Sequence, residues 1–290
     1  MAGSPPKPAG ALVPVEDPAD PRLADYRDLN DAELRRRRGA DDAVVVVEGR
    51  LAVAQLMGST YEVCSLLVDD HQVDALADLV AAVRARGAPV YVGRRPVVAA
   101  TVGFALHRGV VATARRPPPA DPHQVLTTAL RHKSVGDGPP VVVVLEGLND
   151  HENLGALFRN AAAFGAGAVL LSPTCADPLY RRTVRVSLGL VSRVPFGRAG
   201  SWPEDLDEVR RRGYELVALT PAATAPPIVE VATGVGRRPV ALVVGAEGPG
   251  LSSGVLERCR QARIPMAPGV DSLNVAAATA VALFCFAGRA

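Results

Sequence analysis

The chain has 290 residues, of which 48% are hydrophobic and 21% charged, a composition typical of globular and not of disordered proteins. Its 32 lysines and arginines nearly balance 30 aspartates and glutamates, so the net charge of +2 neither requires nor excludes a nucleic-acid partner. The 4 cysteines are far apart and form no CxxC pair, which argues against a zinc site or a redox dithiol and favours reduced thiols in a cytoplasmic protein.

The first 20 residues are rich in proline, alanine and glycine, and we expect a disordered tail there. The opening MAGSPPKPAG lacks a charged start followed by an apolar run, so no signal peptide is expected. Near the other end, the uncharged stretch NVAAATAVALFCFAG is too short and too rich in alanine for a membrane span.

Strands and helices alternate after the tail, which predicts a small α/β domain over residues 21–115. The expected elements are, in chain order, a strand at 42–49, a helix at 50–58, a strand at 62–68, a helix at 72–87, and strands at 88–93 and 109–114. Residues 116–140 are a proline-rich linker that carries one short helix at 124–133.

A second α/β domain is predicted over residues 141–290, with a parallel sheet of about six strands. The expected strands are 141–147, 168–172, 193–196, 214–220, 239–248 and 262–266. The expected helices are 152–165, a basic segment near 180–190, 203–212, one from about 252, and one at the C-terminus. Ligands of such sheets bind at the carboxyl ends of the strands.

The helix at 152–165 places one arginine among very small side chains. A core-facing stripe is formed by Leu154, Leu157, Phe158, Ala161 and Phe164. Arg159 lies on the opposite face, next to Gly155, Ala156, Ala162 and Ala163. Small residues permit a second surface to approach closely, and a buried arginine there needs an anionic or hydrogen-bonding partner. The alternative is a structural arginine paired with a nearby carboxylate. Asn153 is well placed to start this helix.

Two further segments follow buried strands. In LVVGAEGPGLS, Gly245, Gly248 and Gly250 permit a sharp turn around Glu247; the alternative is a turn with a solvated glutamate. In IPMAPGVDSLNV, residues 264–266 offer an apolar edge to a flat heterocycle. Ser272 and Asn274 then head a helix that is apolar all round and therefore expected to be buried, although either residue could be only a helix cap.

Several common sites are excluded. No GxGxxG follows a strand, and neither a P-loop nor a GxSxG nucleophile elbow is present. The 5 histidines are scattered, and none pairs with an acid at metal-ligand spacing, so no metal is expected.

Residues 141–287 resemble the SpoU, or TrmH-type, branch of the SPOUT RNA methyltransferases. The family pattern N-x5-R is matched by Asn153 and Arg159, and the pattern G-x-E-x-x-G by Gly245, Glu247 and Gly250. The pattern I-P-M with S-L-N-V is matched by residues 264–266 and 272–275. The pattern R-x-S-x-G is matched by Arg185, Ser187 and Gly189. Ala276 and Ala277 follow SLNV where the family commonly has serine first, and His151 and Glu152 precede Asn153 where Pro-x is frequent. The N-terminal domain is similar, more loosely, to the ribosomal-protein-like RNA-binding domain often attached to this family.

The resemblance implies S-adenosylmethionine as methyl donor, a deep trefoil knot in the C-terminal domain, and a homodimer whose active site joins two subunits. It implies methyl transfer to a ribose 2′-hydroxyl of ribosomal or transfer RNA, and the extra N-terminal domain favours ribosomal RNA by analogy. The expected catalytic residues are Asn153, Arg159, Glu247, Ser272 and Asn274. The expected donor-binding residues are Leu219, Thr220, Gly245, Glu247, Gly250, Ile264, Met266, Ser272 and Leu273.

Arginine is hardly ever deprotonated in proteins, so we expect Arg159 to position a phosphate and stabilise a developing oxyanion instead of acting as a base. Glu247 would orient Arg159 or shape its loop. Expected RNA contacts are the basic clusters Arg35, Arg36, Arg37 and Arg38, and Arg181, Arg182 and Arg185, with a solvated helix face as the alternative for the first cluster.

Two rival functions come from other classes. One is a non-catalytic RNA-binding protein that retains the fold; the joint presence of Arg159, Glu247 and Asn274 argues against it. The other is a Rossmann-type enzyme with a nucleotide cofactor, against which the missing glycine fingerprint argues.

Overall fold

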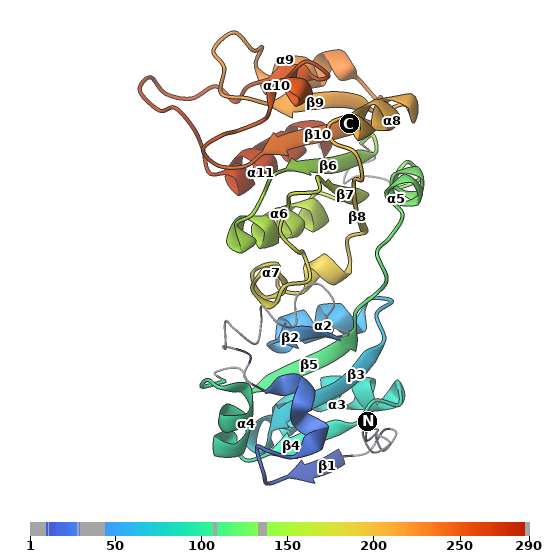
Figure 1. Cartoon of the computed structure of the whole chain (residues 1–290), viewed down its shortest axis with the longest axis vertical. Helices are drawn as coiled ribbons and strands as arrows, with labels where there is room; N and C mark the ends of the chain where they lie inside the picture. Colours follow the sequence, from blue (N-terminus) through green and yellow to red (C-terminus); the bar gives the residue numbers. More distant parts are fainter. Residues whose placement is uncertain are drawn as a thin grey trace. The chain divides into compact units, whose positions relative to one another are not determined.

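The two β-branched runs at 44–47 and 141–144 form strands in two separate sheets of the computed structural model (Figure 1). The structure describes residues 10, 12–27, 29, 44–106, 109–132 and 138–287. Two compact units result: unit 1 is Met1–Pro117 with Leu179–Arg193, and unit 2 is Pro118–Pro178 with Val194–Ala290.

Unit 1 contains a mixed five-stranded sheet in the order β1-β4-β3-β5-β2, in which β5 runs antiparallel to both of its neighbours. Its strands are β1 Leu12–Val15, β2 Val44–Glu48, β3 Val63–Asp69, β4 Val90–Gly93 and β5 Val110–Arg115. Its α-helices are α2 Arg50–Met57, α3 Ala77–Ala85, α4 Arg95–Val102 and α7 Arg181–Val186. Its 3₁₀ turns are η1 Pro21–Tyr26, η2 Asp70–Gln72, η3 Asp74–Leu76 and η5 Leu190–Ser192.

Unit 1 differs from the sequence prediction in several places, and helix α4 is among the elements that were not predicted. Strand β1 lies inside the segment expected to be disordered, because it pairs with β4 and buries Val13 and Val15. The helix expected at 72–87 is shorter, since two 3₁₀ turns precede α3. The segment Leu179–Arg193, expected within the C-terminal domain, belongs to unit 1, where an added Cβ on Gly189 would lie 2.7 Å from the Cα of Ala52.

Unit 2 contains an all-parallel six-stranded sheet in the order β11-β9-β10-β6-β7-β8, which confirms the predicted parallel α/β domain. Its strands are β6 Val141–Glu146, β7 Ala168–Leu171, β8 Phe196–Arg198, β9 Glu215–Leu219, β10 Val240–Gly245 and β11 Arg260–Ala262. Its helices are α5 Pro122–Ala129, α6 His151–Ala163, α8 Asp205–Arg211, α9 Ile228–Val235, α10 Ser253–Leu256 and α11 Val275–Ala287.

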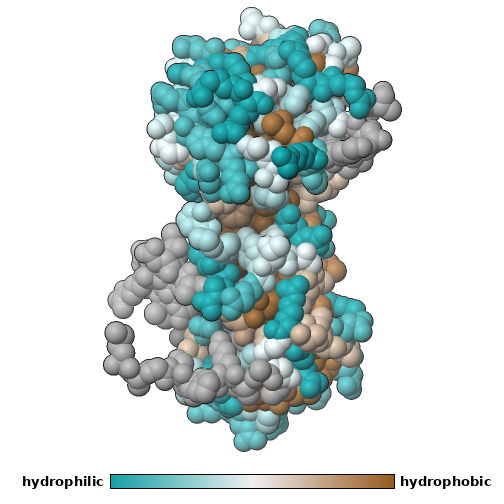
Figure 2. All heavy atoms as spheres, turned by 90° about the vertical axis from the view of Figure 1, so that its right-hand side faces the viewer, coloured by the Kyte–Doolittle hydropathy of each residue, from teal (hydrophilic) through white to brown (hydrophobic). Residues whose placement is uncertain are grey.

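Helices cover both faces of the unit 2 sheet. One face packs against α5, α8 and α10 through a continuous buried cluster. On the other face α11 packs against α6, α9 and the central strands β6 and β10. The surface of unit 2 that carries α8 is largely hydrophilic in Figure 2, and ion pairs such as Arg210–Asp207 and Arg212–Glu208 line that helix. None of the helices in the described part of the chain has the length and hydropathy of a membrane span.

Candidate active site

A cavity of about 670 Å³ opens at the carboxyl ends of β9 and β10, where the loops after β9, β10 and β11 meet the start of α11. Its size is within the range of small-molecule sites. All of the residues expected to bind the donor line it: Leu219, Thr220, Gly245, Glu247, Gly250, Ile264, Met266, Ser272 and Leu273. The segments that the sequence patterns singled out are therefore brought together around one cavity.

The loop after β10 is a tight turn that only glycine permits at its base. A Cβ on Gly245 would lie 2.4 Å from the carbonyl carbon of Gly250, and the Gly250 amide donates to the Ala246 carbonyl at 3.1 Å. Gly248 and Gly250 have φ of 88° and 68°, the left-handed region in which side chains are strained. The backbone of residues 246–250 thus folds back on itself and presents Glu247 beside the cavity.

Asn274 connects three segments through one side-chain amide. Its Nδ2 donates to Asn153 Oδ1 at 2.8 Å and to Glu247 Oε1 at 2.9 Å. Its Oδ1 accepts from the amides of Ala276 and Ala277 at 3.0 and 3.2 Å, so Asn274 is also the N-cap of α11. The cap interpretation of Asn274 is therefore confirmed, and the other end of the same amide contacts Asn153 and Glu247. Its catalytic role stays a prediction.

Helix α6 begins at His151, one residue before the expected start, and its cap is not the expected Asn153. Its N-cap is Asp150, whose Oδ1 accepts from the amide of Asn153 at 2.7 Å. The backbone N–H of Asn153 therefore donates to the capping residue Asp150, and the side chain of Asn153 is left to contact Asn274. Further along, Asn160 Nδ2 donates to the Ala276 carbonyl at 2.7 Å, which gives α6 and α11 a second polar link.

Arg159 lies on the exposed face of α6, and the apolar stripe of this helix is buried as predicted, apart from half-buried Phe164. Within the described part of the chain its guanidinium has no hydrogen bond or ion pair. The structural alternative, an arginine paired with a neighbouring carboxylate, is not what this helix contains. Glu247 contacts Asn274 and not Arg159, so the geometry favours loop shaping over orientation of Arg159.

Comparison with known proteins places this site in a family. Residues 140–284 match the model of the SpoU rRNA Methylase family. The chain belongs to that family.

Relatives and solved structures agree with this assignment. An uncharacterised tRNA/rRNA methyltransferase of Mycobacterium bovis is 44% identical over 93% of this chain and 90% of its own length. The 23S rRNA (guanosine-2′-O-)-methyltransferase RlmB of Photobacterium profundum is 31% identical over 75% of this chain and 86% of its own. An AdoMet-bound rRNA methyltransferase of Sinorhizobium meliloti has a similar structure, with a TM-score of 0.75, 26% identity, and coverage of 95% of this chain and 97% of that one.

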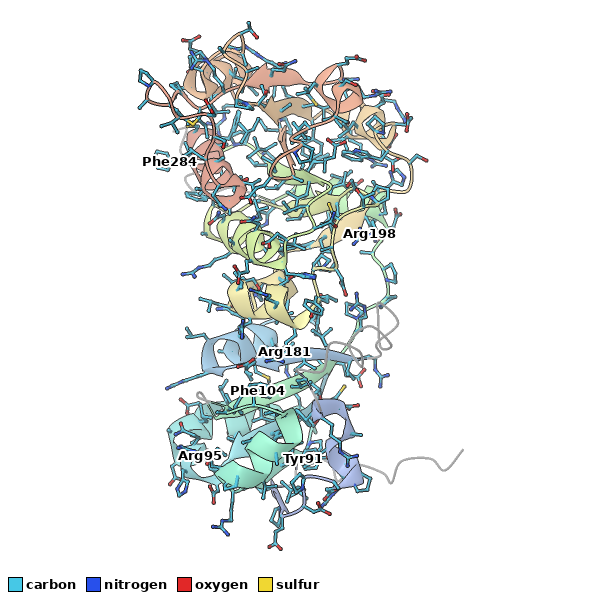
Figure 3. All side chains as sticks on the ribbon, turned by 60° about the vertical axis from the view of Figure 1, so that its left-hand side comes forward. Tyr91, Arg95, Phe104, Arg181, Arg198 and Phe284 are labelled. Carbon is cyan, nitrogen blue, oxygen red and sulfur yellow. The ribbon has the colours of Figure 1, made fainter. Side chains whose placement is uncertain are left out.

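The basic clusters expected to contact RNA have different outcomes. Arg35, Arg36, Arg37 and Arg38 lie outside the described residues. Arg181 donates to the Leu29 carbonyl at 2.7 Å and to Glu48 Oε2 at 3.2 Å, and its guanidinium lies 4.4 Å from the centre of the Phe104 ring (Figure 3). These contacts give Arg181 a structural role in unit 1. Arg182 and Arg185 are exposed on α7, and their contact with RNA stays a prediction.

Two other expectations are wrong in part. Helix α11 is not buried all round, because Val281 and Phe284 are 40% and 66% exposed. One histidine does approach acids: ligand atoms of Asp69, Asp70 and His71 lie within 4.8 Å of one another, because these consecutive residues share the turn after β3. Asp69 already forms an ion pair with Arg95 at 2.9 Å.

Sequence reasoning missed several residues that shape the site. The cavity is also lined by residues that the sequence analysis did not assign to a site, namely Pro221, Val244, Ala246, Pro249, Leu251, Leu256 and Ala278. Asp150 carried a usable signal, since it directly precedes a helical apolar stripe. Glu146, at the end of β6, carried none, because its partners are far away in the sequence.

Proposed function

We propose that this protein is an S-adenosylmethionine-dependent methyltransferase that methylates a ribose 2′-hydroxyl of ribosomal or transfer RNA. The observation that carries the proposal is the contact of Asn274 with Glu247, beside the cavity, and with Asn153, on the helix that also presents Arg159. Family membership and the 2′-O-methyltransferase activity named for the Photobacterium relative support the same chemistry.

The cavity fits S-adenosylmethionine by shape and by the chemistry of its walls. Leu219, Ile264 and Leu273 offer apolar surface to a flat adenine, and the folded loop at 246–250 brings main-chain amides and carbonyls to the same cavity. When bound there, this donor supplies the transferred methyl group. AdoMet is also present in the solved structure of the Sinorhizobium protein.

Arg159 is the group we assign to the RNA. Its exposed guanidinium lies on the small-residue face of α6, where a phosphate or a ribose can approach. A 2′-hydroxyl becomes nucleophilic as its proton leaves, and a fixed positive charge stabilises the oxygen in that state. Because arginine stays protonated, Arg159 acts by electrostatic positioning, and the proton passes to another acceptor. Asn153 and Ser272 orient the nucleotide.

The homodimer implied by the resemblance is part of the proposal. Ala277, Val281 and Phe284 form an exposed stripe on α11, and the Phe284 ring meets Phe164 edge-on with centroids 6.4 Å apart. Figure 3 shows Phe284 projecting away from the ribbon of α11. An apolar stripe with aromatic residues is typical of a protein interface. A second copy covering it would approach the helix that bears Arg159.

Three finer assignments complete the proposal. Ribosomal RNA is the favoured substrate class, since two of the relatives, RlmB of Photobacterium profundum and of Pseudomonas syringae, are named for 23S rRNA. A cytoplasmic location is part of the proposal, and the wide spacing of the four cysteines without a CxxC pair supports it. A knot is supported by the course of the chain after the edge strand β11, which returns to place α11 against the central strands β6 and β10.

The test is methyl incorporation from labelled S-adenosylmethionine into separate, unmodified ribosomal and transfer RNA, followed by digestion to nucleosides. Label in a 2′-O-methylnucleoside from one RNA class supports the chemistry and identifies the class. Label on a base overturns the proposed acceptor. Donor binding without any transfer supports the non-catalytic RNA-binding alternative.

A further inference from the structure

Glu146 is the last residue of β6, and its carboxylate accepts three hydrogen bonds from two other loops. Oε1 accepts from Trp202 Nε1 and from Ser252 Oγ, both at 2.7 Å. Oε2 accepts from the backbone amide of Ser252 at 2.8 Å. Within the described residues no lysine, arginine or histidine forms an ion pair with Glu146, so neutral donors hold its charge in place.

The position of Ser252 makes this cluster relevant to the donor cavity. Residues 244–251 line the cavity, and Ser252 follows them directly as the N-cap residue of α10. The near end of the loop is fixed at Gly245, which pairs with Glu146 in the parallel register of β10 and β6. Glu146 therefore holds both ends of the loop, one through the sheet and the other through its side chain, although it does not itself line the cavity.

Trp202 connects the same carboxylate to the loop that follows β8. Its indole is half-buried against the core cluster of unit 2, and Pro203 Cγ would lie 3.1 Å from a Cβ on Gly254 in α10. Arg198, at the end of β8, does not compete for this carboxylate, because it donates to the carbonyls of Ser172, Pro173, Cys175 and Ala176 (Figure 3). The Trp202 N–H thus has Glu146 as its acceptor, and Glu146 joins the indole to the loop.

We propose that Glu146 is a positioning residue for methyl-donor binding, which holds the loop at 246–251 in its cavity-lining form through Ser252 and transmits occupation of the cavity to Trp202. This inference rests on the proposed function, because it requires the donor in that cavity. Hydrogen bonds to a charged acceptor are stronger than neutral ones, and glutamine would replace one accepting oxygen by a donor that opposes its present partners.

The experiment compares E146Q with wild type and with E257Q, which makes the same charge change at an exposed residue directly after α10. Donor affinity is measured by calorimetry, and kcat and KM for S-adenosylmethionine by methyl transfer. We expect E146Q to raise the dissociation constant and KM on the order of tenfold while kcat at saturating donor changes less than about twofold, the pattern of lost binding without lost chemistry. E257Q matches wild type.

The single tryptophan of the chain supplies a second readout. In wild type, we expect addition of S-adenosylmethionine to change the emission of Trp202, because the acceptor of its N–H is also bound to the residue that ends the cavity-lining loop. In E146Q saturating donor no longer changes the emission. A purely structural glutamate would alter the melting temperature without uncoupling this signal from binding.

The outcomes separate the two proposals. If wild type binds the donor and a folded E146Q binds it equally well, the role of Glu146 is overturned and the proposed function stands. If wild type does not bind the donor at all, both fall together. Should E146Q not fold, S252A decides, since it removes one donor to Glu146 and keeps the backbone one: a raised dissociation constant supports the proposal, and an unchanged one overturns it.

Discussion

The side-chain amide of Asn274 donates to Asn153 Oδ1 across 2.8 Å, which joins residues 121 positions apart. Asn153 stands in the first turns of α6, and Asn274 caps α11. The same amide nitrogen reaches Glu247 on the loop after β10. A single side chain therefore fixes the distance between the helix that carries Arg159 and the loop that borders the donor cavity.

Two substitutions at Asn274 separate its role as helix cap from its contacts with Asn153 and Glu247. Asn274→Asp keeps an oxygen for the amides of Ala276 and Ala277, but it loses the Nδ2 donor and places a carboxylate next to that of Glu247. We expect the free energy of unfolding to change by less than about 1 kcal/mol, since the cap survives. The rate of methyl transfer should fall about tenfold or more, because loss of the hydrogen bond to the Glu247 carboxylate raises the activation free energy by about 1.4 kcal/mol or more.

Asn274→Ala is the matched comparison, because it removes both functions. We expect it to lose about 1 kcal/mol of stability as well as activity. Chemical denaturation and methyl incorporation, run on both variants, provide the measurements. Wild-type activity in Asn274→Asp would show that the hydrogen bond from Asn274 to Asn153 has no role in the reaction.

Arg159→Ala tests the charge proposed to face the RNA. Donor affinity should stay within about threefold of wild type, and methyl transfer should fall about a hundredfold or more, the scale of one key electrostatic group. Arg159→Lys should recover only part of the rate, because an ammonium lacks the planar fork of a guanidinium. Arg210→Ala serves as control, since this arginine forms an exposed helix pair with Asp207 on the α8 surface. Retained turnover in Arg159→Ala would remove Arg159 from the mechanism.

The sequence predicted those parts of the fold and site that depend on local pattern. The run at 141–145 had to be a buried strand, and the stripe through Leu154 and Phe158 is buried as its spacing indicated. The residues that the resemblance implied for donor binding, which follow strand ends, all line one cavity. Helices α4 and α9 were missed, because their β-branched residues weaken helical propensity, although Pro96 and Gly103 marked the ends of α4.

Contacts between distant loops could not be predicted from pattern. Glu146 reads as the end of a strand, and nothing near it indicates Trp202 or Ser252, which lie 56 and 106 positions away. Arg181 shows the opposite failure. Its basic neighbours suggested RNA, but a carbonyl, a carboxylate and the Phe104 ring take up its guanidinium. Charge clustering does not reveal which cations are already paired by the fold.

Gly245→Ala should distort the proposed donor cavity, because the added Cβ would clash with the backbone of the same loop. The new Cβ would lie 2.4 Å from the carbonyl carbon and oxygen of Gly250 and 2.7 Å from the Leu251 amide, all backbone atoms that cannot rotate away. We expect the loop to shift and donor affinity to fall about tenfold or more, the cost of a displaced binding loop of about 1.4 kcal/mol. Gly200→Ala is the control, because nothing lies within 4 Å of its added Cβ. Calorimetry that finds equal affinity in both variants would contradict the role assigned to this turn.

Cys259 predicts a pH dependence of stability in unit 2. Burial raises the pKa of its thiol to about 12, whereas an exposed thiol titrates near 8.5. Above about pH 9 the unfolded chain loses this proton and the folded chain keeps it, so rising pH favours unfolding. The free energy of unfolding should fall faster in wild type than in Cys259→Ala, by up to about 1.4 kcal/mol per pH unit. Denaturant titrations at pH 8 and pH 10 measure the difference. Parallel pH profiles would mean that the thiol is not kept neutral.

The exposed stripe on α11 predicts the effect of Phe284→Glu. Phe284 is 66% exposed in the single chain and continues the apolar line of Val281 toward Phe164, so a second copy would bury it and desolvate the new carboxylate. Aromatic anchors of this kind contribute about 2 kcal/mol or more to association, which corresponds to a rise of roughly thirtyfold in the dimer dissociation constant. Sedimentation over a concentration series measures it. Val229→Glu is the control, since Val229 is 61% exposed on α9 and outside this stripe.

Because the active site is proposed to join two subunits, methyl transfer by Phe284→Glu should recover as protein concentration rises. A variant that stays dimeric would place the interface elsewhere. A wild type that sediments as a monomer would overturn the proposed dimer.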